Sequence, residues 1–127
     1  MTFSLIIPCY NESKNIPLLL ERCSLITKTD EVEVIIVDNG SNDETQAVLS
    51  NLLPKYPGCR SVKVKENKGY GYGILSGLYA ADTDLIGWTH ADLQTDPKDI
   101  LEALKFFKKS DNEIFCKGKR YGRPLLD

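Results

Sequence analysis

The sequence predicts an α/β fold, a Rossmann-like and mainly parallel sheet with helices on both faces. Short apolar runs alternate with segments of helical spacing along the chain, a pattern typical of parallel sheets. One run, Val34–Val37, is continuously apolar and β-branched, as in a strand covered on both faces. With 127 residues, the chain is long enough for one domain with a hydrophobic core.

Five short apolar runs are the predicted strands. They are Ser4–Ile7, Val32–Val37, Ser61–Lys65, Leu85–Thr89 and Glu113–Cys116. Pro8 cuts the first run short and no basic region precedes it, so we expect a strand there and not a signal peptide. No apolar run approaches the roughly 20 residues that a membrane span needs.

Each gap between these runs carries helix signals. In the first gap Asn15 or Ser13 can cap a helix that has Pro17 in its first turn. The apolar residues of that helix fall on one face: Leu19, Leu20, Cys23 and Ile26. In the second gap Ser41–Glu44 has the form of a capping box, and Pro54 ends the helix.

The third and fourth gaps are also predicted to be helical. Gly73–Ala81 has helical character despite Gly77. In the fourth gap Asp96 is the expected cap and Pro97 the first helical residue. Apolar residues then recur at helical spacing, at Ile100, Leu101, Leu104 and Phe107.

Composition and charge narrow the class of protein. Hydrophobic residues make up 42% and charged residues 27%, which indicates a soluble globular domain. Sixteen basic and eighteen acidic residues leave a net charge of −2, which argues against a nucleic-acid partner. The four cysteines are scattered and form no Cys-x-x-Cys pair: Cys9, Cys23, Cys59 and Cys116. We therefore expect reduced thiols in a cytoplasmic protein, without a zinc site or a disulfide scaffold.

The polar residues that follow the strands predict the functional site. Ligands of open parallel sheets bind beyond the carboxyl ends of the strands. Acids, amides, one lysine and an aromatic ring follow four of the runs, in the segments Pro8–Glu12, Asp38–Asp43, Glu66–Gly73 and His90–Gln94. This mixture suits a nucleotide.

Each polar group has an expected role. Asp38 could accept hydrogen bonds from a base, Glu12 or Asp43 from ribose hydroxyls, and Tyr10 could stack on the base. Lys68 lies among glycines, where bare backbone N–H groups can approach a phosphate.

A divalent cation is expected after the fourth strand. Alternation would place His90, Asp92 and Gln94 on one side of an extended segment, where Asp92 and Gln94 could hold Mg²⁺ or Mn²⁺ that bridges a diphosphate.

Structural explanations of the same residues stay open. Asp38–Gly40 could be only a turn, Glu12 and Lys68 could be solvated, and His90 could be a hydrogen-bonded structural residue. The remaining candidates could serve turns, helix packing or the covering of a helix start: Gly69, Gly71, Gly73, Gly77, Tyr70 and Tyr72.

Other nucleotide-binding and catalytic classes fit poorly. Gly71–Ser76 lacks the last glycine of Gly-x-Gly-x-x-Gly and follows the third strand, so a dehydrogenase is disfavoured. No Walker A motif is present, and the single histidine forms no visible Ser/His/Asp arrangement. Pro8–Glu12 is not the basic, glycine-rich loop of sugar nucleotidyltransferases.

Four segments together resemble family-2 glycosyltransferases, most closely the dolichyl-phosphate mannose synthase branch. They are Ile6–Glu12, Ile36–Thr45, Asn67–Gly71 and Ala91–Pro97, in the family's order and across nearly the whole chain. The resemblance implies a GT-A fold and transfer of a hexose from a UDP- or GDP-sugar. It implies a polyprenyl-phosphate or glycan acceptor and a place in cell-envelope polysaccharide synthesis, with the full-length protein at the cytoplasmic face of the membrane.

The resemblance also implies site residues. Pro8, Tyr10, Glu12 and Asp38 would line the nucleoside pocket, with Lys68, Gly69 and Ala91 near the nucleotide. Asp92 and Gln94 match the metal ligands of an Asp-x-Asp-type motif, which makes Asp92 the expected catalytic residue. Gly118 and Arg120 resemble a Gly-x-Arg segment at the diphosphate or acceptor side.

Two departures from the family pattern stand out. His90 occupies a position where the family usually has an acid, so the imidazole is a further possible metal ligand and would favour Mn²⁺. The acceptor-binding half expected after the fifth strand is absent, so we expect residues 1–127 to be a single donor-binding domain cut from a longer protein. Such a half-domain could bind nucleotide without catalysing transfer, and its exposed edge could drive self-association.

Overall fold

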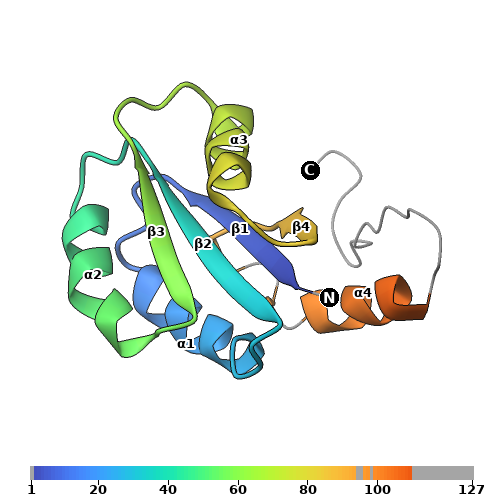
Figure 1. Cartoon of the computed structure of the whole chain (residues 1–127). Helices are drawn as coiled ribbons and strands as arrows, with labels where there is room; N and C mark the ends of the chain where they lie inside the picture. The colour runs from blue at the N-terminus through green and yellow to red at the C-terminus, as the bar shows by residue number, and fades with distance from the viewer. Residues whose placement is uncertain (1, 94–95, 98, 110–127) are drawn as a thin grey trace, which may run out of the picture.

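The described chain forms a parallel sheet. The computed structural model describes residues 2–93, 96–97 and 99–109. Within them four parallel strands lie in the order β3-β2-β1-β4 (Figure 1). Their bounds are β1 Phe3–Cys9, β2 Val32–Asn39, β3 Cys59–Val64 and β4 Leu85–Trp88. The predicted parallel α/β fold is confirmed; the predicted fifth strand, Glu113–Cys116, lies outside the described residues.

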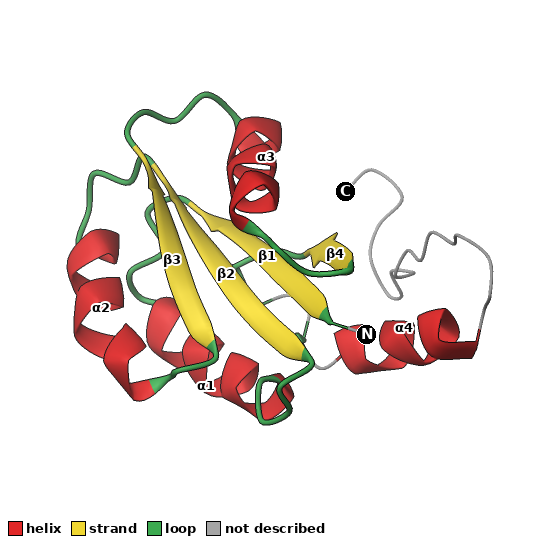
Figure 2. Cartoon of the chain, in the orientation of Figure 1, coloured by secondary structure: helices red, strands yellow, loops and turns green. Residues whose placement is uncertain are grey.

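Helices cover both faces of the sheet, as Figure 2 shows. Helices α1 (Ile16–Ile26), α2 (Thr45–Leu52) with the 3₁₀ turn η1 (Leu53–Lys55), and α4 (Asp99–Lys109) contribute to one core cluster. Helix α3 (Tyr70–Ala80) packs on the opposite face. The chain crosses the sheet from β1 through β2 to β3, and then returns past β1 to form β4. Because each crossover between parallel strands is right-handed, this reversal places α3 on the face opposite α1 and α2. No helix in the described part of the chain is both long and apolar enough to cross a membrane.

Strand β1 divides the core. Alternate residues face the cluster under α1: Phe3, Leu5, Ile7 and Cys9. The residue between two of them, Ile6, faces α3 together with Ile35 and Val37, and all three are fully buried.

Two strands run further than their apolar runs predict, so that Pro8, Cys9, Asp38 and Asn39 are strand residues. Pro8 is tolerated in a central strand for a local reason. The Ile6 carbonyl accepts the Thr89 N–H at 3.0 Å, so even-numbered residues of β1 direct their backbone groups toward β4. Because β4 ends opposite Ile6, the missing N–H of Pro8 removes no ladder bond.

The first helix follows its prediction. Asn15 is at the N-cap position, Pro17 is in the first turn, and the four predicted apolar residues are buried. The Asn15 side chain does not cap the helix; it donates to Glu12 Oε2 at 2.7 Å.

The other helix starts differ from prediction. Helix α2 begins at Thr45 without a capping box, because the Ser41 hydroxyl accepts the Asn11 N–H at 2.9 Å and thereby ties two loops together. Helix α4 begins at Asp99, after a turn in which the Asp99 N–H bonds to the Asp96 carbonyl at 2.9 Å.

Helix α3 begins at Tyr70, three residues before its predicted start, behind Gly69 at φ 107°. Gly77 lets the helix lie close to the sheet, because a Cβ there would overlap Ile6 Cγ2 and lie 3.0 Å from Val37 Cγ2. A Cβ on Gly71 would meet no atom within 4 Å. The helix-packing explanation therefore holds for Gly77 and not for Gly71.

Candidate functional site

The site lies at the carboxyl edge of the sheet. The strand order reverses direction between β1 and β4, and ligands of open parallel sheets bind in the crevice beside such a switch point. The loops that follow the four described strands meet at this edge, and side-chain hydrogen bonds and one ring stack join them in sequence.

The loops after β1 and β2 are tied together. The Asn11 N–H donates to Ser41 Oγ at 2.9 Å, and Asn11 Oδ1 accepts the Asn42 N–H at 3.0 Å. The Glu12 N–H donates to Thr45 Oγ1 at 3.0 Å. These bonds fix the backbone that carries Tyr10 and Glu12 against the turn that follows Asp38.

Thr45 is the buried centre of this junction. Its side chain is fully buried, and its hydroxyl donates to Asp43 Oδ1 at 2.5 Å while it accepts from Glu12. The hydrogen bond from Thr45, together with further bonds from Ser13, lowers the pKa of the Asp43 carboxyl. Asp43 is thus engaged in holding the two loops.

The predicted nucleoside ligands are held in place. Glu12 is half-buried and its Oε2 accepts from Asn15, so its carboxylate is held and only partly solvated. Asp38 is 2% exposed and its Oδ1 accepts the Ser41 N–H at 3.1 Å. The turn proposed as an alternative does exist, with Gly40 at φ 74°, but it encloses a buried carboxylate. The Tyr10 ring is 44% exposed, as a stacking platform requires.

This end of the site is acidic. Burial, followed by the nearby carboxylates of Asp38, Glu12 and Asp43, raises the pKa of the Cys9 thiol to about 12. Three acids around the end of β1 suit the N–H and O–H donors of a nucleoside and repel a phosphate.

The loop between β3 and α3 holds the backbone of Gly69 in place and presents a lysine. The Gly69 N–H donates to Asn67 Oδ1 at 2.8 Å, and its carbonyl accepts from Asn39 Nδ2 at 3.1 Å. Lys68 is exposed, with Nζ 5.3 Å from the centroid of the Tyr72 ring. A cation and a helix N-terminus therefore stand together, an arrangement that favours an anion.

The segment after β4 bends instead of extending. Residues 91–93 form a bend with Leu93 at φ 67°, so the predicted alternation does not continue through Asp92. Ala91 is 4% exposed and packs in the core, whereas Asp92 is exposed. The predicted ligands Gln94, Gly118 and Arg120 lie outside the described residues.

His90 contacts the start of α3. The Tyr70 and His90 rings are stacked at 16° with centroids 5.3 Å apart, and Tyr70 Oη lies 3.2 Å from His90 Nδ1. Burial and the nearby Asp92 carboxylate raise the pKa of Tyr70, so Asp92, His90 and Tyr70 share one corner of the edge. The structural explanation of His90 as a hydrogen-bonded residue is therefore correct as far as its Nδ1 is concerned.

The donor set at this corner fits a metal that arrives with a nucleotide. Among the described residues, no three His, Cys, Asp or Glu side chains gather to hold a metal ion. A divalent cation is often bound by one or two protein groups, with substrate phosphates and water completing its shell. Asp92 with His90 supplies such a partial set.

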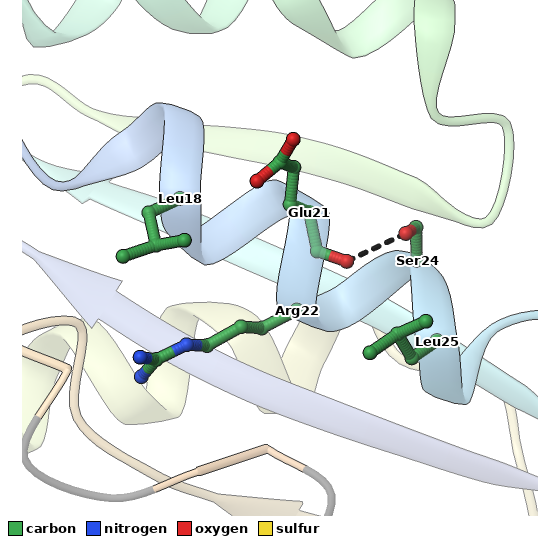
Figure 3. Close-up of a pocket in the computed structure, with 5 residues that line it drawn as sticks. All are labelled: Leu18, Glu21, Arg22, Ser24 and Leu25. Carbon is green, nitrogen blue, oxygen red and sulfur yellow. Dashed lines mark hydrogen bonds between the residues drawn. The ribbon is translucent and has the colours of Figure 1, made fainter.

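A shallow cavity of about 360 Å³ lies elsewhere, on the outer surface of α1 (Figure 3). Its lining comes from one helix: Leu18, Glu21, Arg22, Ser24 and Leu25. Ser24 bonds to the Glu21 carbonyl at 2.6 Å, a local helix contact. One lining residue, Arg22, donates to the Leu93 carbonyl at 3.5 Å and so reaches the segment after β4; all five lining residues belong to α1 and none to the strand ends.

Three residues that hold the site had no role predicted from the sequence, namely Asn11, Asn39 and Thr45, and Tyr70 was expected only to cover the start of a helix. Asn39 is adjacent to Asp38, and Tyr70 lies between two glycines, so their positions were visible in the motifs. Their partners are 20 to 33 residues away, and no local pattern reveals them.

Comparison with known proteins agrees with this geometry. A model of glycosyl transferase family 2 matches residues 4–124. The undecaprenyl-phosphate 4-deoxy-4-formamido-L-arabinose transferase of Photorhabdus laumondii is 37% identical over 106 residues, which cover 80% of this chain and 32% of that protein. Its counterpart from Enterobacter sp. is 38% identical over 103 residues, 76% of this chain and 31% of that protein. The chain thus spans about a third of these curated relatives.

Solved structures share the fold. The mannosyltransferase PcManGT from Pyrobaculum calidifontis, in complex with GDP-Man and Mn²⁺, has a TM-score of 0.70 and 24% identity, and the match covers 83% of this chain and 32% of that one. TarS residues 1–349 from S. aureus, in complex with UDP-GlcNAc, has a TM-score of 0.68 and 27% identity, with 85% and 31% covered. These neighbours are GT-A glycosyltransferases. From its strand ends, its fold and its sequence match, this chain belongs to glycosyltransferase family 2.

Proposed function

We propose that this chain is the donor-binding domain of a glycosyltransferase that moves a hexose from a UDP- or GDP-sugar to a polyprenyl-phosphate or glycan acceptor. The observation that carries the proposal is the distribution of charge along the carboxyl edge of the sheet, which is acidic at one end and favours anions at the other. Three carboxylates surround the end of β1, whereas Lys68 and the N-terminus of α3 stand at the other end.

The acidic end is the proposed nucleoside pocket. The Asp38 carboxylate would accept from the base, the Glu12 carboxylate from the ribose, and the Tyr10 ring would stack on the base, with Pro8 lining the pocket. The burial of Asp38 supports this role, because a desolvated carboxylate gains most from a matched N–H donor.

The other end is the proposed diphosphate site. Lys68 would contact the diphosphate, with Gly69 and Ala91 beside it and Arg120 from outside the described residues. Asp92, Gln94 and His90 would hold Mg²⁺ or Mn²⁺. When bound, the cation neutralises negative charge that develops on the departing diphosphate.

The names of the relatives support a lipid-linked acceptor. They are undecaprenyl-phosphate transferases, and a phosphate acceptor is already an anion that needs little help from a general base. We therefore propose a role in cell-envelope polysaccharide synthesis at the cytoplasmic face of the membrane. The relatives are more than twice as long as this chain, and we propose that the acceptor is bound by the part of such proteins that this chain does not match.

Isothermal titration calorimetry tests the donor site. UDP, GDP and their hexose derivatives are titrated into the folded chain with Mn²⁺ or Mg²⁺. We expect one nucleotide to bind with metal-dependent affinity, and Asp38→Asn and Lys68→Ala to weaken that binding. Glu102→Gln is the matched charge control, because its salt bridge lies on the exposed surface of α4. If none of these nucleotides binds, the proposal is refuted.

A second candidate is a nucleotide-binding half-domain that is not catalytic alone. It is favoured by the coverage of only about a third of the relatives and by the single described carboxylate at the metal corner. Nucleotide binding without donor hydrolysis or transfer, in this chain and in a longer version, would favour it over the transferase.

A further inference from the structure

Tyr70 and His90 form a contact that the proposed binding roles leave unexplained. The two residues lie on different elements, at the first residue of α3 and in the loop after β4. They are joined twice, by ring stacking at 5.3 Å and by the 3.2 Å approach of Tyr70 Oη to His90 Nδ1. The stacking fixes the plane of the imidazole ring, and the approach of Oη to Nδ1 fixes how the ring is turned within that plane.

This geometry distinguishes the two nitrogens of the imidazole. Nδ1 is engaged by the tyrosine hydroxyl, so a ligand that binds the ring binds it through Nε2. A metal-bound histidine commonly donates its other ring N–H to an oxygen acceptor, which fixes the tautomer and the ring orientation. A tyrosine oxygen at Nδ1 satisfies that requirement.

We propose that Tyr70 is a positioning residue for His90, which it holds so that Nε2 is presented to the metal and diphosphate of the donor. This inference rests on the proposed function and deepens it. It assigns the histidine, which stands where the family usually has an acid, a specific nitrogen and a specific support.

The support itself is rigid. Gly69, directly before Tyr70, is held at its N–H by Asn67 and at its carbonyl by the buried Asn39. Helix α3 is seated on the sheet through Gly77. The orientation of His90 thus depends on the end of β2, two strands from β4 in the sheet.

The ring contact is tested by nuclear magnetic resonance. His90 is the only histidine, so ¹⁵N-histidine labelling reports on this ring alone. Spectra at pH 8 are compared for the unaltered chain, Tyr70→Phe, which keeps the stack and removes the hydroxyl, and Tyr79→Phe. Tyr79 lies on the same helix and is 88% exposed, which makes it the matched control. We expect the Nδ1 resonance to move in Tyr70→Phe and not in Tyr79→Phe; an unmoved Nδ1 resonance overturns the proposal.

The role in donor binding is tested by affinity for Mn²⁺·UDP and Mn²⁺·GDP. We expect Tyr70→Phe to weaken binding by about 2- to 10-fold, the range of one net hydrogen bond, and Tyr70→Leu to weaken it further. In a His90→Ala background Tyr70→Phe should have no additional effect. With ¹⁵N-histidine and bound nucleotide, the pulsed paramagnetic resonance of Mn²⁺ should show coupling to a ring nitrogen, which Tyr70→Leu reduces.

The outcomes separate the two proposals. If Nδ1 moves but Tyr70→Phe binds nucleotide as the unaltered chain does, Tyr70 has only a structural role and the inference is overturned. If the unaltered chain binds neither nucleotide, the proposed function is refuted, and with it the role of His90 in donor binding. The ring spectra then still decide whether Tyr70 fixes the orientation of His90.

Discussion

Replacement of Gly77 by alanine should move helix α3 off its seat on the sheet. A Cβ at this position would overlap Ile6 Cγ2 and lie 3.0 Å from Val37 Cγ2. Both side chains are fully buried and belong to central strands, so neither has space to withdraw. The helix must shift outward or the core must strain.

The expected magnitude follows from two opposed effects. An alanine in a helix interior is favoured over glycine by about 1 kcal/mol, whereas overpacking of a filled core costs roughly 1–3 kcal/mol. Gly71 provides the matched control on the same helix, since a Cβ there meets nothing within 4 Å. Gly71→Ala should be neutral or stabilising by up to about 1 kcal/mol. The difference between the two variants therefore isolates overpacking, about 1–3 kcal/mol.

Urea unfolding followed by circular dichroism measures this difference, and thermal midpoints should separate by several degrees, at roughly 4 °C per kcal/mol. Ile6→Ala in the Gly77→Ala background should cost less than the sum of the single changes, because it removes the atoms that the new methyl group meets. Gly77→Ala should also weaken nucleotide binding, since Gly69 and Tyr70 lie at the start of the displaced helix. If Gly77→Ala is as stable as Gly71→Ala, the close seating of α3 is wrong.

Two further predictions concern titratable groups around the end of β1. Cys9 is 3% exposed with its pKa raised to about 12, so iodoacetamide at pH 8.5 should label it far more slowly in the native chain than in urea; peptide mass mapping that finds equal rates would contradict its burial. The pKa of Asp43 is lowered below its usual 3.8, so its contribution to stability is present above that value and is lost as the pH falls through the lower folded-state pKa. We therefore expect Asp43→Asn to lose less stability than the unaltered chain between pH 7 and pH 3, as measured by urea unfolding. A pH dependence identical to that of the unaltered chain would show that the Thr45 and Ser13 hydrogen bonds do not hold the carboxylate.

Much of the fold was predictable because its signals are local. The β-branched run around Ile35 and the apolar face that contains Leu19 and Cys23 each report burial through their own periodicity. Helix starts were less predictable. The Ser41 hydroxyl has two competing uses, a cap of its own helix or a bond to the distant Asn11 N–H, and local sequence does not rank them.

The gathering of polar residues at one edge of the sheet was predictable, and their detailed geometry was not. The position of Asp38, Glu12 and Lys68 at the carboxyl edge was predictable, because they follow apolar strands and parallel strands end at a common edge; their binding roles stay predictions. The extended geometry expected through His90, Asp92 and Gln94 does not hold, since the chain bends at residues 91–93. Alternation holds only while a strand has a neighbour to pair with, and β4 ends opposite Ile6.

The sequence by itself determined the parallel α/β class, the family resemblance and the residues that gather at the carboxyl edge, because each depends on patterns within a few residues. Only the tertiary structure decided how those residues are held. The bonds from Glu12 to Thr45, from Asn39 to Gly69 and from Tyr70 to His90 join loops 20 to 33 residues apart. Such contacts form only after the sheet has brought the strand ends together, so their partners are chosen by packing in space and not by spacing along the chain.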